Sequence, residues 1–135
     1  MADSPIQVRG IDHVTLVVKD LAASRQFYVD LVGMDEVPRP AFSFPGLWFQ
    51  SGTTLIHLIG EHDESGPAGY PDQVVRTNTR NHHIAFLVDD AAAVTEVLKQ
   101  HNVPLVADAK HRPDGAVQVF AYDPDGHVIE FCSNP

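Results

Sequence analysis

Short apolar blocks alternate with polar stretches along the chain, and one block occurs twice. The run at residues 11–18 carries His13 near its start, closes on an aspartate and leads into a helix-forming stretch. The run at residues 83–88 follows the same plan, and His83 stands 70 residues (83 minus 13) after its counterpart. Repeated supersecondary units fold alike, so this repeat predicts a pseudo-symmetric fold. A histidine at the head of each copy marks a candidate shared site.

The remaining blocks predict the order βαβββ in each copy. Asp20 stands where a helix N-cap belongs, and Gly33 is typical of a helix end. The turn predicted at 123–126 has the sequence Asp-Pro-Asp-Gly, which favours a tight reversal between two strands. Other predicted strands span residues 36–40, 48–50, 54–59, 117–122 and 127–132, and Asp89 or Asp90 caps the second helix.

Length and composition predict one ordinary globular domain. The chain has 135 residues, of which 44% are hydrophobic and 20% charged. We expect a single domain over residues 1–135, with modules at about 10–60 and 80–133 joined by a connection at 61–79.

The net charge and the cysteine content of the chain limit its possible partners and cellular compartment. A formal net charge of −9 argues against non-specific nucleic-acid binding, although a local basic patch can still attract an anionic substrate. The single cysteine, Cys132, excludes an intrachain disulfide and fits a reducing compartment. No apolar run is long enough for a membrane span, and the N-terminus lacks a signal-peptide pattern. We expect a cytoplasmic protein with no membrane or nucleic-acid partner.

Four polar residues interrupt the apolar strands of the two modules. The module ends align when His57 is set on Glu130, an offset of 73 (130 minus 57) that a slightly longer loop explains. Glu130 lies between two large apolar residues, and a buried carboxylate needs a proton, a cation or a metal. Histidine nitrogens suit first-row divalent ions. One ion bound by His13, His57, His83 and Glu130 would satisfy all four groups.

The sequence resembles the vicinal-oxygen-chelate superfamily over roughly residues 10–133. This superfamily includes glyoxalase I, methylmalonyl-CoA epimerase, extradiol dioxygenases, fosfomycin-resistance enzymes and bleomycin-sequestering proteins. The matching segments are Ile11–Leu21, Phe27-Tyr28, Leu31–Gly33, His82–Phe86, Val88–Asp90 and Tyr122–Glu130. The resemblance implies an α+β fold in which two βαβββ modules in pseudo-two-fold arrangement form a curved mixed sheet around a metal-binding cavity. It also implies a homodimer.

The resemblance also implies roles for individual residues. One divalent ion (Zn, Ni, Fe or Mn) would be held by His13, His83 and Glu130, and would chelate two neighbouring oxygens of a small-molecule substrate. His57 stands where glyoxalase I has a glutamate ligand, which is a departure from the pattern. His57 can therefore be a fourth metal ligand, a catalytic base or neither, and Glu130 is the other candidate base.

Three functions are compatible with this site. The first is a metal-dependent lyase or isomerase of the glyoxalase type, in which the ion polarises a carbonyl while a base moves a proton. The second is an extradiol-type dioxygenase or a fosfomycin-type resistance enzyme with the same ligands. The third is a non-catalytic protein that sequesters a drug, although such proteins typically lack the ligands.

The remaining polar residues have less specific interpretations. We expect His82 to be structural or at the surface, and an inert buried thiol at Cys132. The histidines expected to be exposed are His62, His101, His111 and His127. Residues that could contact an anionic substrate are Tyr70, Arg76, Arg80, Lys110, His111 and Arg112.

Overall fold

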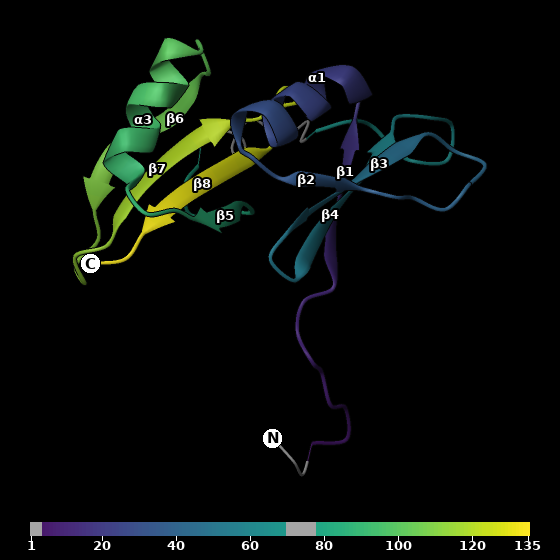
Figure 1. The fold of residues 1–135 in the computed structure, drawn as a ribbon, viewed down its shortest axis with the longest axis horizontal. Helices are drawn as coiled ribbons and strands as arrows, with labels where there is room; N and C mark the ends of the chain where they lie inside the picture. Colours follow the sequence, from purple (N-terminus) through teal and green to yellow (C-terminus); the bar gives the residue numbers. More distant parts are fainter. Residues whose placement is uncertain (1–3, 70–77) are drawn as a thin grey trace. The chain divides into compact units, whose positions relative to one another are not determined.

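The computed structural model describes residues 4–69 and 78–135, and the chain divides into two compact units. The first unit ends at Gly66 and the second begins at Pro67. Each unit combines one four-stranded mixed sheet with a helical segment (Figure 1). The predicted α+β class is confirmed, whereas the expected division into one domain with two modules stays a prediction.

The first unit has the predicted order of one strand, a helical segment and three strands. Its elements are β1 (His13–Val18), α1 (Leu21–Arg25), the π-helix η1 (Gln26–Leu31), β2 (Asp35–Val37), β3 (Gly46–Ser51) and β4 (Thr54–Gly60). The sheet order is β1-β4-β3-β2, with β1 parallel to β4 and the other pairs antiparallel. The first and last strands of the unit are therefore neighbours.

The second unit repeats this arrangement. Its elements are β5 (Ile84–Leu87), α3 (Ala91–Gln100), β6 (Leu105–His111), β7 (Val117–Tyr122) and β8 (Val128–Ser133). The sheet order is β5-β8-β7-β6, again with a parallel first pair. Thr15 pairs with His57 in the first sheet and Ala85 with Glu130 in the second. These registers place His57 and Glu130 at equivalent positions, as the sequence repeat predicted.

The helical segment of the first unit begins where predicted but changes type midway. The Asp20 carboxylate accepts hydrogen bonds from two backbone N–H groups of the first turn, at 2.9 and 3.2 Å. The helix then widens into the π-helix η1, which nothing in the hydrophobic pattern predicted. Gly33, with φ of +92°, ends the segment in a conformation that favours glycine. Tyr28 of η1 is fully buried beside Phe49 of β3, which fastens the segment to the sheet.

Hydrogen bonds to the side chains of two aspartates stabilise a helix start and a turn in the second unit. The Asp90 carboxylate caps α3 through the Ala93 N–H at 3.1 Å. Asp123 stabilises the predicted turn by accepting the His127 N–H at 2.8 Å, and Gly126 supplies a φ of +85°. The expectation that His127 is exposed is wrong, because the turn holds its backbone at the start of the sheet and leaves the residue 5% exposed.

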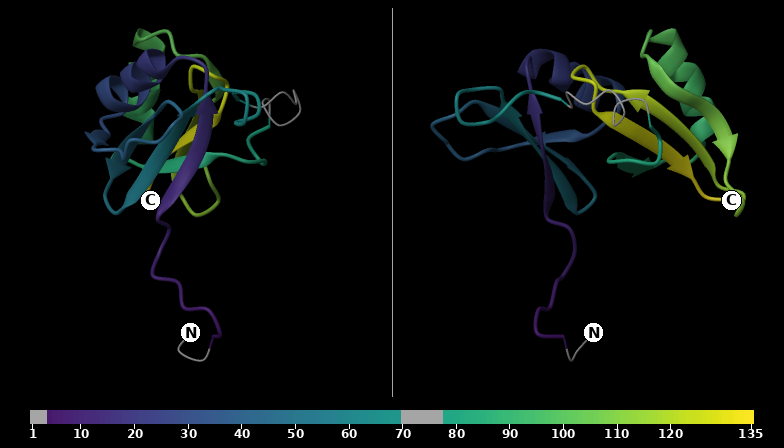
Figure 2. Two further views of the ribbon diagram at one scale, coloured as in Figure 1. Left: turned by 90° about the vertical axis from the view of Figure 1, so that its right-hand side faces the viewer. Right: turned by 180° about the vertical axis from the view of Figure 1, so that it is seen from behind.

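The chain before β1 lies outside the core. Residues 4–12 are exposed, and their trace runs away from the sheet of the first unit in both views of Figure 2. Within residues 4–69 and 78–135, no helix has the length and apolar character needed to cross a bilayer.

Candidate metal and catalytic site

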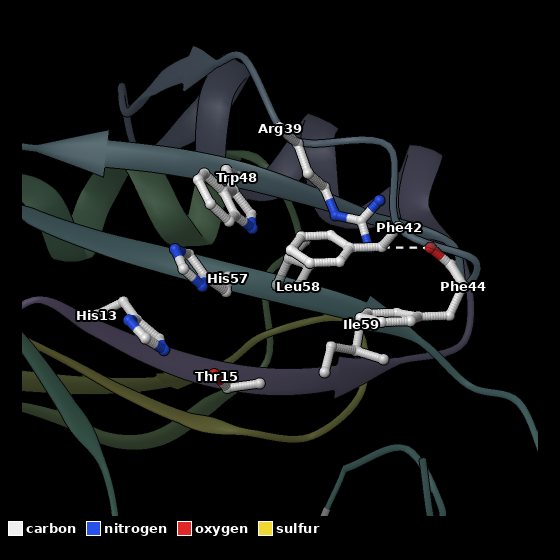
Figure 3. A pocket seen from close by; sticks show the side chains of 9 residues that line it. All are labelled: His13, Thr15, Arg39, Phe42, Phe44, Trp48, His57, Leu58 and Ile59. Atoms are coloured by element: carbon white, nitrogen blue, oxygen red, sulfur yellow. Dashed lines mark hydrogen bonds between the residues drawn. The ribbon is translucent and has the colours of Figure 1, made fainter. Parts of the chain in front are cut away.

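The first unit brings together two of the four predicted donors. His13 begins β1, and His57 lies on the adjacent strand β4. Residues two apart on a strand share a face, so His13 points to the same side as Thr15, the register partner of His57. The two imidazole rings stack with centroids 3.8 Å apart and planes inclined by 11° (Figure 3).

A tryptophan completes this stack from the other side. Trp48 of β3 stands opposite His57 in the sheet, and its ring lies 4.0 Å from the imidazole at an angle of 3°. His57 is therefore held flat between an indole and an imidazole (Figure 3). The sequence alone did not single out Trp48, although counting back from the Ser51–Thr54 turn pairs it with His57.

His13 and His57 each have one ring nitrogen that makes no hydrogen bond among the described residues. His13 Nδ1 lies 2.7 Å from Asp12 Oδ2, and a carboxylate oxygen only accepts, so Nδ1 carries the proton and Nε2 keeps its lone pair in the neutral ring. His57 Nε2 is buried and has no hydrogen-bond partner among the described residues. Burial lowers the pKa of His57, and the neighbouring His13 lowers it further, which favours the neutral form of the ring.

Asp12, His13 and His57 could hold a metal by spacing, since their donor atoms lie within 4.8 Å of one another. Two features argue against one ion on all three. Asp12 is already bonded to Nδ1 of His13. An imidazole binds a metal in the plane of its ring at about 2.0–2.1 Å, and the two stacked rings have nearly parallel planes. An ion in the plane of His13 therefore lies outside the plane of His57.

The second unit brings together the other two predicted donors. His83 directly precedes β5, and its Nε2 lies 3.0 Å from Oε1 of Glu130 on β8. His83 Nδ1 donates to the backbone carbonyl of Asn81 at 2.7 Å, which leaves Nε2 with the lone pair when the ring is neutral. Two acceptor atoms at this distance repel unless a cation lies between them. The pair therefore needs a proton or a metal ion.

Glu130 is buried, as its position between apolar residues predicted. It is 4% exposed, and Gln118 Nε2 donates to its Oε2 at 3.0 Å. Phe120, the register partner of Glu130, presents its ring edge-on to His83 at 5.4 Å. The sequence alone did not single out Gln118, but its spacing of two from Phe120 puts both on the face of β7 that Glu130 shares.

The other candidate residues play no part in these two donor pairs. His82, His101 and His111 are exposed, as predicted, whereas His62 is half-buried and stacks on Phe44 with centroids 5.4 Å apart. Arg80 is exposed, and Lys110 lies over the Phe120 ring at 5.9 Å. Tyr70 and Arg76 lie outside the described residues.

Arg112 and Cys132 are occupied by structural contacts. Arg112 pairs with Asp114, and this hydrogen-bonded ion pair lowers the pKa of the Asp114 carboxyl to about 2. Burial raises the pKa of the Cys132 thiol, and the nearby Glu130 raises it further. The raised pKa favours the protonated thiol, but Cys132 is half-buried where a buried residue was expected, and its inertness stays a prediction.

A cavity of about 260 Å³ opens beside the histidine stack of the first unit (Figure 3). Its walls are mostly aromatic and aliphatic, and the side chains that line it include no acidic residue. One guanidinium, that of Arg39, faces the cavity from the end opposite to His13.

The match to a family model agrees with this geometry. Residues 10–131 match the model described as the Glyoxalase/Bleomycin resistance protein/Dioxygenase superfamily. The chain belongs to this superfamily. The fold is shared with solved structures. One is a glyoxalase/dioxygenase from Nostoc punctiforme, which superimposes with a TM-score of 0.77 and is 29% identical over 98% of this chain and 95% of that chain.

Curated relatives carry glyoxalase names at low identity. The protein named Glyoxylase I 4 from Arabidopsis thaliana is 26% identical over 98% of this chain and 75% of its own length. Lactoylglutathione lyase from Haemophilus influenzae is 27% identical over 90% of each chain. Proteins of this superfamily often are enzymes that use a divalent metal and act on small molecules.

Proposed function

We propose that this protein is a metal-dependent lyase or isomerase of the glyoxalase type. His13, His83 and Glu130 hold one divalent ion, and His57 moves the proton. The ion, when bound, supplies Lewis acidity to two neighbouring oxygens of a small substrate.

The observation that carries the proposal is the arrangement of His83 against Glu130. The imidazole lone pair and the carboxylate face each other at 3.0 Å, and the carboxylate is almost fully buried. A divalent cation relieves both the repulsion and the cost of burying the charge. His13 supports the proposal because its bond to Asp12 uses Nδ1 and leaves Nε2 available as a third donor.

Three neighbours are suited to orient these ligands. Asp12, Asn81 and Gln118 each engage one atom of a ligand side chain, and leave the other donor atom available. Partners of this kind fix the tautomer and direction of a metal ligand.

We assign the proton transfer to His57. Its ring is neutral, its Nε2 has no partner among the described residues, and its stacking against His13 does not suit binding of the same ion. A neutral imidazole beside a metal-bound substrate can accept a proton from one carbon and return it to the next.

A second candidate function is an extradiol dioxygenase, because the stacking of His57 against His13 disfavours His57 as a ligand of the same ion. Without His57, the ligands are two histidines and one carboxylate, a set that leaves positions open for a catechol and oxygen on Fe(II). Catechol cleavage that requires Fe(II), with no turnover of thiol adducts, would replace the first candidate by this one.

Metal titration tests the ligand set. Calorimetry of chelator-treated protein with Ni(II), Zn(II), Mn(II) and Fe(II) should show one ion per chain. Changing His13 or His83 to Ala, or Glu130 to Gln, should weaken binding by about 100-fold or more. His101→Ala, at an exposed histidine of the second unit, is the matched control and should leave affinity unchanged.

Turnover assays then test the reaction. The metal-loaded protein is assayed with methylglyoxal–thiol adducts, acyl-CoA epimers, catechols and fosfomycin. Isomerisation of an adduct or an epimer supports the proposal. Stoichiometric metal without turnover of any of these four substrate classes contradicts it, and an absence of metal binding contradicts it more directly.

A further inference from the structure

The cavity of the first unit differs in charge from the rest of the molecule. The chain carries a formal net charge of −9, yet the cavity is lined by one arginine, two histidines and no acidic residue. Local charge of one sign in an apolar concave wall attracts ligands of the opposite sign. This cavity is therefore an attractive place for an anion on an otherwise acidic protein.

Arg39 provides the positive charge, and no carboxylate pairs with it among the described residues. Its Nη2 donates to the Phe44 carbonyl at 2.9 Å, and its guanidinium carbon lies 4.8 Å from the Phe42 ring centroid and 5.0 Å from that of Phe44. These contacts hold the guanidinium in place while most of its N–H groups stay available. Gly46 lies against the same group, since a Cβ there would meet Arg39 Nε at 2.9 Å and the Leu58 carbonyl even more closely.

The walls between Arg39 and the histidines suit a flat apolar group. Phe42, Phe44 and Trp48 contribute aromatic rings to the lining, and Ile59 lies beside the Phe44 ring (Figure 3). A cavity of roughly 150 Å³ holds one benzene, so about 260 Å³ holds a single ring with a short side chain.

We propose that this cavity binds the substrate as an aromatic carboxylate, with its ring against the aromatic wall and its carboxylate on Arg39. This inference rests on the proposed function, because it places the reacting oxygens of the substrate at the His13–His57 end. Arginine recognises carboxylates through paired charge-assisted hydrogen bonds, which distinguishes this class from neutral aromatic compounds.

The single tryptophan of the chain reports on the cavity directly, because Trp48 lines it. Tryptophan fluorescence and calorimetry of the full chain should detect binding of phenylacetate and 3-phenylpropanoate. The neutral phenylacetamide and the aliphatic hexanoate should each bind about tenfold more weakly. Chelator-treated protein is used, so that binding to the cavity is separated from binding to a metal.

Substitutions separate the contribution of the Arg39 charge to ligand binding from that of the aromatic wall. Arg39→Gln should abolish the preference for phenylacetate over phenylacetamide, and Arg39→Lys should restore part of it. Phe42→Ala should weaken both ligands alike and keep the preference. Arg112→Gln, in the second unit, is the matched control and should change neither. Circular dichroism verifies that each variant is folded. If Arg39→Gln unfolds, Arg39→Lys and Phe42→Ala still test the inference.

Equal affinity for the acid and the amide, or a preference that survives Arg39→Gln, overturns the inference. An absence of binding also overturns the inference. This includes the case in which a second copy of the chain covers Phe42, and sedimentation velocity detects such a dimer. Metal binding and adduct turnover without aromatic-acid binding would leave the proposed function intact and remove only this inference. Aromatic-acid binding without metal binding would contradict the proposed function and leave aromatic-acid binding by this cavity supported.

Discussion

The two units place their donor residues at equivalent points of equivalent sheets but surround them differently. In the first unit, His57 lies between aromatic rings, and burial lowers its pKa. In the second, Glu130 occupies the matching position, accepts one hydrogen bond from Gln118 and lies 3.0 Å from Nε2 of His83. The same backbone position thus carries an imidazole between aromatic rings in one unit and a hydrogen-bonded carboxyl group in the other. On the proposed function, this position serves proton transfer in the first unit and metal binding in the second.

Replacing His57 by Gln should break this division most strongly. We expect turnover to fall by about 10²–10⁴-fold, since a general base is lost, while metal affinity changes by only a few-fold. Steady-state kinetics and calorimetry on the same preparation measure both. A loss of metal affinity as large as that of Glu130→Gln would make His57 a ligand instead of a base.

Replacing Gln118 by Ala sharpens the comparison from the second unit. The Glu130 carboxylate loses its orienting partner, so metal affinity should fall by about 10–100-fold. Gln50→Ala, a glutamine on β3 that donates to the Gly52 carbonyl, is the matched control. Equal affinities of the two variants would show that Gln118 does not orient the ligand.

Replacing Trp48 by Leu should destabilise the first unit by about 1–2 kcal/mol, because stacked rings and buried area are lost. It should also raise the pKa of His57 toward its ordinary value by exposing the ring. Urea unfolding and NMR titration measure these effects. Phe120→Leu, at the equivalent strand of the second unit, should destabilise without moving the His57 pKa, and an equal shift in both variants would contradict a local cause.

The smallest effect is the titration of His57 itself. NMR of the metal-free protein should give a pKa below the ordinary value of 6.5. Because the unfolded chain then binds more protons than the folded one, His57 contributes stability above about pH 6.5 and loses it as the pH falls through the folded value. A His57→Gln variant should show a weaker loss of stability over this range, and a measured pKa at or above 6.5 rules out the neutral ring.

Much of the fold was predictable because its determinants are local or repeated. The helix caps at Asp20 and Asp90, and the turn that ends in Gly126, follow from side chains that bond their own neighbourhood. Aligning the two copies predicted that His57 and Glu130 occupy equivalent positions, and strand register brings each beside the histidine of its own unit.

The rest depends on partners that the pattern of apolar residues does not specify. Trp48 and Gln118 reach the site through strand register, which is set by turns some residues away. Arg39 falls within the strand predicted at 36–40, but β2 ends at Val37, and the position of Arg39 is set by its aromatic neighbours. The π-helix η1 has the same apolar spacing as an ordinary helix, so hydrophobicity alone does not reveal it.

The most direct test measures metal stoichiometry and affinity in three proteins: the unaltered chain, His13→Ala and Glu130→Gln. These two variants remove one donor from each unit. We predict one ion per chain in the unaltered protein and a loss of binding of about 100-fold or more in both variants. Two ions per chain, or one variant that keeps full affinity while the other loses it, would contradict a single ion shared by both units.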